Sequence, residues 1–218
     1  RDKNGAAMSD DHNFAFGEPL RGRIERHMVA FERRAHPHDG LKRAAVAVAV
    51  IDDGEGEGAL VLTKRSPKLR THTSQWALPG GRIDPGEGPA DAVLRELSEE
   101  VNVSLPQDQV LGTLDDYPTR SGYLITPVVV WCAPGVEMVA NPDEVASIHR
   151  IPFTELNRPD SPAFISIPES DRPVIQMLIN DNRVHAPTGA VLYQFREVGL
   201  HGRDVRVDQL EQPVWAWR

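Results

Sequence analysis

Apolar residues recur at helical spacing near the start of the chain. Within residues 18–34 they fall every three or four positions, at Leu20, Ile24, Met28 and Phe31. This spacing predicts an amphipathic helix with one buried face. Another helix is expected over residues 171–180, where an apolar run has a proline near its start.

Short apolar runs between turn residues predict a sheet. Residues 44–51 are small and β-branched, which is typical of a strand buried on both faces. Further strands are expected at residues 59–65, 75–79, 109–117, 123–133, 146–153 and 189–195. Prolines indicate a surface loop at 157–170, and the tail from residue 213 has an ambiguous, strand-like pattern. This mixed order predicts a sheet sandwiched between helices in one domain.

A glycine-rich loop leads into a further helix in the middle of the chain. Residues 79–88 contain four glycines and two prolines, so the loop bends sharply and exposes backbone carbonyls. Gly88 and Pro89 suit the start of the helix, and Asn102 tolerates the left-handed conformation that ends it. The apolar stripe that would seat this helix on the sheet consists of Ala90, Leu94, Leu97 and Val101.

Three glutamates crowd this helix roughly opposite its apolar stripe. Glu96, Glu99 and Glu100 should therefore point outward, facing the glycine-rich loop. Like charges at i,i+4 spacing repel by about 0.2–0.5 kcal/mol per pair. A divalent cation would turn this repulsion into attraction, because Mg²⁺ prefers carboxylate, carbonyl and water oxygens. Taken alone, however, such a cluster is usually a solvated helix face.

The spacing around the glutamates favours a site. One long pattern joins Gly81, Glu87, Arg95, Glu96, Leu97, Glu99, Glu100 and Val103. It resembles the Nudix box, Gly-x5-Glu-x7-Arg-Glu-U-x-Glu-Glu-x-Gly-U, where U is aliphatic. Asn102 stands where the pattern has glycine, a change that the capping argument makes inexpensive.

The resemblance implies the Nudix fold, an α/β/α sandwich with a mixed central sheet. It also implies hydrolysis of a nucleoside diphosphate linked to another moiety. Mg²⁺ or Mn²⁺ would be bound by Glu96, Glu99 and Glu100, with the Gly80 carbonyl as a further ligand.

The chemistry of the site assigns different roles to the candidate catalytic residues. Metal ions screen a diphosphate and lower the pKa of a water, and a carboxylate can then take the proton. Arg95 is better suited to orienting a glutamate than to touching substrate, with Glu87 as its partner. Glu144, just before the strand at 146–153, is a candidate general base, and the alternative is an ordinary loop carboxylate.

Residues 62–81, LTKRSPKLRTHTSQWALPGG, are similar to an additional signature of coenzyme A pyrophosphatases. Arg65, Ser66 and Arg70 match it, whereas Ser74 and Leu78 depart from it. The resemblance implies that the matching residues bind substrate, and basic side chains would suit the 3′-phosphate of coenzyme A. The alternative for these cations is a basic hairpin end that serves solubility.

Several functions therefore remain open within the resemblance. The first is cleavage of coenzyme A or acyl-CoA to 3′,5′-ADP and 4′-phosphopantetheine. Hydrolysis of ADP-ribose or another nucleotide sugar is the alternative with the same chemistry. A catalytically silent nucleotide sensor is an alternative of another class.

Composition and charge limit the classes of binding partner that this protein can be expected to have. The 218 residues carry a net charge of −8, which disfavours general nucleic-acid binding. No segment is apolar for long enough to span a membrane, and a single cysteine, Cys132, excludes an internal disulfide and fits a cytoplasmic protein. We expect a small-molecule nucleotide as partner. The tail with Trp215 and Trp217 is compatible with core packing, base stacking or a homodimer.

The sequence predicts a short remnant followed by one domain. Residues 1–7, before the first methionine, are interpreted as an expression remnant. Residues 8–218 would form a single Nudix hydrolase domain with the N-terminal helix at 18–34. The Nudix core would span about 43–156, and residues 157–218 would be a C-terminal extension.

Overall fold

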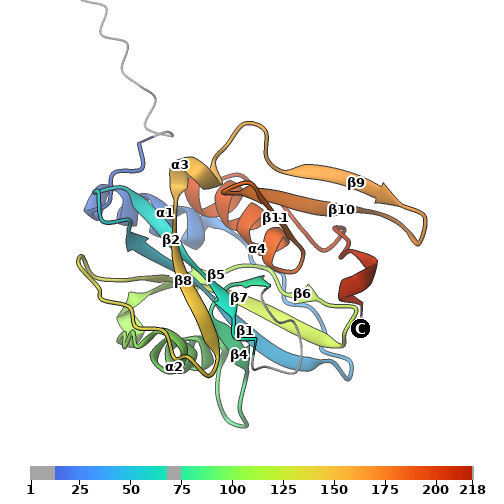
Figure 1. The fold of residues 1–218 in the computed structure, drawn as a ribbon, viewed down its shortest axis with the longest axis horizontal. Coiled ribbons are helices and arrows are strands. Elements are labelled where there is room, and N and C mark those ends of the chain that lie inside the picture. The colour runs from blue at the N-terminus through green and yellow to red at the C-terminus, as the bar shows by residue number, and fades with distance from the viewer. Residues whose placement is uncertain (1–12, 68–74, 218) are drawn as a thin grey trace, which may run out of the picture.

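The computed structural model describes residues 13–67 and 75–217, and Figure 1 shows a sheet lying between helices. The large sheet has eight strands: β1 (Lys42–Asp52), β2 (Gly58–Arg65), β3 (Trp76–Ala77), β4 (Gly80–Arg82), β5 (Val110–Thr113), β6 (Tyr117–Pro118), β7 (Tyr123–Trp131) and β8 (Val145–Pro152). Its order is β3-β2-β1-β7-β5, with β4 on β1, β6 on β7 and β8 on β2. Only β1 and β7 run parallel among these pairs, so the sheet is mixed as expected.

Helices cover both faces of this sheet. They are α1 (Glu18–Ala30), α2 (Pro89–Val101), α3 (Phe153–Leu156) and α4 (Thr188–Phe195), with a π-helical segment at Arg196–Leu200 and 3-10 turns at Gln107–Gln109 and Val214–Ala216. Figure 1 shows α2 on one side of the sheet and α1 with α4 on the other. Among the described residues, no helix has the length and apolar character needed to cross a membrane.

The alternation of β1 explains this layering. Ala45, Ala47 and Ala49 point to one face and pack with α2, where their small size lets the helix approach closely. Val48 and Val50 point to the other face, into a larger core that includes α1 and α4. The prediction that this strand is buried on both faces is confirmed, and the layers form an α/β/α sandwich.

The C-terminal extension contains a second sheet, and three predictions there were wrong. Its strands are β9 (Ala163–Ile167), β10 (Ser170–Ile179) and β11 (Asn182–His185), in the order β11-β10-β9. The helix predicted at 171–180 is therefore strand β10, and the loop predicted at 157–170 contains β9. The strand predicted at 189–195 is helix α4, and the strand-like tail forms a 3-10 turn.

Tertiary pairing and complete burial account for these errors. A short apolar run is compatible with either helix or strand, and β10 is fixed by its pairing with β9 and β11. The overlooked signal was Asn180-Asp181, both with positive φ, which make the two-residue turn into β11. Helix α4 is buried on almost every side, so its sequence lacks the polar face that marks an amphipathic helix.

Helix α1 ends four residues earlier than predicted. Phe31 is already extended, and the residues after it are held by the loop between β5 and β6. Arg33 forms an ion pair with Asp116 at 2.7 Å, and the backbone N–H of Arg34 donates to Asp115. Contacts distant in sequence therefore determine where this helix stops.

Candidate functional site

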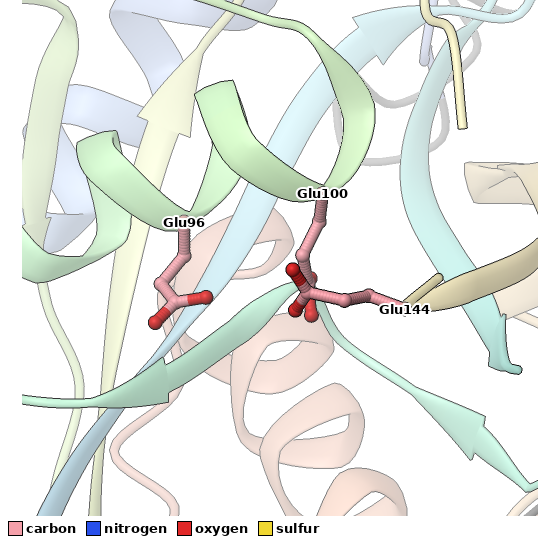
Figure 2. Close-up of side chains that lie close together, drawn as sticks. All are labelled: Glu96, Glu100 and Glu144. Atoms are coloured by element: carbon pink, nitrogen blue, oxygen red, sulfur yellow. The ribbon is translucent and has the colours of Figure 1, made fainter. Parts of the chain in front are cut away.

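Three glutamates from two elements converge in the described structure. Glu96 and Glu100 lie one turn apart on α2, and Glu144 lies on the loop before β8. Each offers a carboxylate oxygen, and these oxygens all lie within 4.8 Å of one another. Figure 2 shows the Glu144 side chain reaching toward the Glu100 carboxylate, with Glu96 on the other side of Glu100. The cluster therefore joins residues that are separated by more than forty positions in the chain.

The glutamates of α2 do not all point outward as predicted. Glu96 and Glu100 are buried, because the flank of α2 packs against the glycines of β4. The Glu99 side chain is 52% exposed and lies outside the cluster, where it bonds to Arg95. The predicted ligand set is thus divided, with Glu144 rather than Glu99 beside the other two.

Glycines of β4 make room for the buried carboxylates. The Gly80 N–H donates to Glu100 Oε2 at 3.1 Å. A methyl group on Gly81 would overlap Glu96 Oε1, so glycine lets this carboxylate lie directly on the strand. A methyl group on Gly80 would instead overlap the Ala45 carbonyl of the neighbouring strand. Gly80 also lines the cavity described below, beside the glutamates.

Arg95 organises the exposed side of the cluster. It forms a bidentate pair with Glu87, at 2.8 and 3.1 Å, as the sequence predicted. Its Nη1 donates to Glu96 at 2.9 Å and to Glu99 at 3.0 Å. Glu87, followed by Glu96, raises the pKa of Arg95 against the effect of burial, so the guanidinium stays charged. With its donors occupied in this way, Arg95 orients Glu96 and is a positioning residue.

The electrostatics of the cluster suit a cation. Burial, reinforced by the neighbouring Glu96 and Glu144, raises the pKa of Glu100 to about 8, and the Gly80 N–H and Arg65 oppose this shift. Burial also raises the pKa of Glu96, although Arg95 opposes this. A divalent ion would reverse both shifts, since carboxylate oxygens are the ligands that Mg²⁺ and Mn²⁺ prefer. The donor set therefore fits such an ion.

Comparison with known proteins identifies the family. The family model described as NUDIX domain matches residues 41–175, which is more than half of the chain. The chain belongs to the NUDIX domain family. This NUDIX region contains the whole carboxylate cluster and all eight strands of the large sheet.

Similar proteins share this NUDIX region. A Photorhabdus laumondii protein named uncharacterized Nudix hydrolase NudL is 42% identical over 118 residues, which cover 54% of this chain and 62% of that protein. Nudix hydrolase 3 of Caenorhabditis elegans is 30% identical over 149 residues, covering 65% of this chain and 62% of that protein. The chain thus spans about three fifths of the length of these relatives.

A solved structure supports the fold. The crystal structure of a MutT/nudix family protein from Enterococcus faecalis matches with a TM-score of 0.52 and 19% identity. The match covers 85% of this chain and 75% of that one. The prediction of a Nudix fold is therefore confirmed.

A cavity of about 940 Å³ opens beside the carboxylate cluster. Glu96, Glu100 and Glu144 line one part of it, and strands β1, β4 and β7 contribute to its wall. Five basic side chains also line it: Lys42, Lys64, Arg65, Arg82 and Arg183. Within residues 13–67 and 75–217, none of the five has a carboxylate partner within 4.0 Å. The cavity therefore combines a cation site with unneutralised positive charge.

The predicted substrate-binding residues lie in different places. Arg65 lines the cavity near Glu100, and its Nε is buried without a hydrogen-bond partner in the described chain. Ser66 is buried, and its hydroxyl donates to the Pro142 carbonyl at 3.2 Å. Its backbone N–H donates to the Glu144 carbonyl, so Ser66 holds the loop that carries Glu144. Arg70 lies outside the described residues.

Sequence reasoning missed the cavity residues of the extension. Arg183 and His185 on β11 line the cavity, together with Trp215 of the 3-10 turn. The available signal was their spacing, because residues two apart on a strand share one face. This spacing was not recognised, because no strand was predicted at Asn182–His185.

Proposed function

We propose that this chain is a divalent-metal-dependent hydrolase of phosphoanhydride bonds in nucleoside diphosphate derivatives. The observation that carries the proposal is the convergence of Glu96, Glu100 and Glu144 at a cavity lined by five cations, none of which has a carboxylate partner among the described residues. A diphosphate needs both features, because its own charge repels a nucleophile. Membership of the NUDIX domain family and the names of the relatives support the same chemistry.

Each residue of the cluster would have a distinct role. Glu96 and Glu100, fixed on a helix, would hold Mg²⁺ or Mn²⁺, which when bound offsets phosphate charge and acidifies water. Glu144, half-buried on a loop, would accept the proton of the attacking water at its carboxylate. Arg95 would keep Glu96 oriented, as its 2.9 Å bond does now. We leave Glu99 out of the ligand set because its carboxylate bonds to Arg95 away from the cluster.

For the substrate itself we propose coenzyme A or an acyl-CoA. The motif at residues 62–81 supports this, and so does the excess of cations in the cavity, which suits a substrate with a phosphate beyond its diphosphate. Arg65 is the strongest candidate for a phosphate contact, since its buried Nε has no hydrogen-bond partner within the part of the chain that the structure describes. ADP-ribose, which has no third phosphate, would leave part of this charge unmatched.

A substrate panel tests the proposal. Purified protein with Mg²⁺ is incubated separately with coenzyme A, dephospho-CoA, ADP-ribose, NADH and deoxynucleoside triphosphates, and products are separated by chromatography. We expect 3′,5′-ADP and 4′-phosphopantetheine from coenzyme A at the highest kcat/KM. Cleavage of ADP-ribose alone would overturn the substrate assignment. Equal, background rates for wild type and Glu100→Gln on every compound would overturn the proposed hydrolase activity. They would favour a catalytically silent nucleotide sensor.

A further inference from the structure

Part of the wall of the cavity comes from outside the NUDIX region. The family model ends at residue 175, whereas Arg183, His185 and Trp215 follow it and line the same cavity. At about 940 Å³ the cavity lies at the upper end of the range for ligand sites. A substrate that reaches the carboxylates would therefore extend onto this wall.

Trp215 presents an unoccupied aromatic surface there. It is 57% exposed, and its only ring contact in the described structure is a T-shaped pair with His185, with centroids 5.6 Å apart. Trp217, by contrast, is covered by Arg120 at 4.9 Å and donates its indole N–H to the Gln212 carbonyl. An exposed tryptophan in a cavity is free to stack on a planar ring.

Trp76 is the other indole of the cavity, and it is already engaged. The Lys64 ammonium lies 4.7 Å from its ring centroid. The His149 ring packs against it at 4.5 Å in an edge-to-face arrangement. Trp215 is therefore the better platform for a base.

The segment that carries Trp215 is anchored rather than loose. Glu211, fully buried, accepts hydrogen bonds from Arg120, Arg172 and Ser170. The next residue, Gln212, accepts from the Arg120 backbone N–H at 2.7 Å. These bonds hold the following 3-10 turn in place, so the indole is positioned before any ligand binds.

Arg183 is exceptional among the arginines of the extension. The other arginines of this segment that the structure describes pair with carboxylates: Arg158, Arg172, Arg196, Arg203 and Arg206. Arg183 instead donates one N–H to Gln176 Oε1 at 2.8 Å, and the Gln176 amide then lies 2.9 Å from His185 Nε2. This chain fixes Arg183 beside His185 and leaves the remaining guanidinium donors for a ligand.

We propose that the extension forms the subsite for the nucleoside end of the substrate, where Trp215 stacks on the base and Arg183 binds a phosphate on the ribose. The inference rests on the proposed function and deepens it. It identifies the preferred substrate class as a nucleoside diphosphate derivative with an additional ribose phosphate. The NUDIX region then acts on the diphosphate bridge, and the extension selects the nucleoside.

Calorimetric binding without metal tests this subsite separately from hydrolysis. The probes, in the presence of EDTA, are AMP, adenosine 3′,5′-bisphosphate and ribose 5-phosphate. Trp215→Ala should lower the affinity for both adenosine nucleotides about tenfold and leave the affinity for ribose 5-phosphate unchanged. Trp215→Phe should retain most of the affinity for the nucleotides. Arg183→Gln should weaken the bisphosphate about tenfold more than AMP, and Arg183→Lys should lose less.

Arg203→Gln is the matched control, because Arg203 is a paired arginine of the extension outside the cavity lining. It should bind all three probes like the wild type. Wild-type affinities for Trp215→Ala and Arg183→Gln would overturn the subsite, as would a wild type that binds AMP no better than ribose 5-phosphate. A loss of nucleotide affinity in Trp76→Ala instead of Trp215→Ala would overturn the choice of Trp215 as the residue that stacks on the base. Failure of the proposed function shows differently, as absent turnover with Mg²⁺.

Discussion

Replacing Gly81 by alanine should disable the cation site while leaving the fold intact. The added methyl would overlap Glu96 Oε1 and lie 2.7 Å from its Cδ. Ordinary contact begins at 3.4 Å, so the Glu96 carboxylate carbon must move by at least about 0.7 Å and its Oε1 by more, or the carboxylate must turn away. Such a shift misplaces one metal ligand, which we expect to weaken Mn²⁺ binding by about 10–100-fold. Because only the end of a flexible side chain moves, the cost to folding should stay below about 1 kcal/mol.

Gly80→Ala is the matched comparison, one residue away. Its methyl would overlap the Ala45 carbonyl oxygen and lie 2.7 Å from Val46 Cα, and Gly80 has a φ of +152°. Backbone atoms cannot turn aside, so this variant should lose about 1–3 kcal/mol of unfolding free energy. Manganese titration followed by electron paramagnetic resonance measures binding, and urea denaturation measures stability. Wild-type Mn²⁺ affinity in Gly81→Ala would refute the assignment of Glu96 as a ligand.

Three further predictions address the base, the buried carboxylate of the tail and the helix cap. Glu144→Gln should lower kcat by at least about 100-fold with Mn²⁺ affinity nearly unchanged, whereas Glu100→Gln should weaken Mn²⁺ binding; equal losses of affinity would make Glu144 a ligand rather than the base. Burial alone would raise the pKa of Glu211, but hydrogen bonds from Arg120 and its other donors lower that pKa to about 2. A lowered pKa stabilises the fold above about pH 5, so Glu211→Gln should cost about 3 kcal/mol at pH 7 in urea denaturation. That difference should shrink as the pH falls from 5 toward 2, and a constant difference would count against the ion pairs. Asn102→Gly should keep full turnover, and Asn102→Ala should lose about 1–2 kcal/mol of stability, because Asn102 has a φ of +58°.

Local rules of sequence predicted the centre of the molecule well. Gly88, Pro89 and Asn102 mark both ends of α2 as observed, and the pairing of Arg95 with Glu87 follows from their box positions. These features depend on neighbours within one turn or one loop. The same local spacing could not show which flank of α2 meets β4, so Glu96 and Glu100 were expected outside and are buried.

Features that bring together segments distant in the chain could not be predicted from the sequence. Glu144 was recognised as a candidate, but its place beside Glu100 depends on the pairing of β8 with β2. The cavity wall with Arg183 depends on a strand pair whose apolar run was interpreted as a helix. In both cases tertiary packing decided the structure, and helix-like and strand-like patterns were equally compatible with the residues.

Diffraction at the manganese edge from crystals soaked in Mn²⁺ tests the central claim most directly. The account predicts an anomalous peak at coordination distance from the carboxylates of Glu96 and Glu100, on the side that faces the cavity, and no such peak in crystals of Glu100→Gln. A peak elsewhere, or only solvent beside these carboxylates at saturating Mn²⁺, would contradict it.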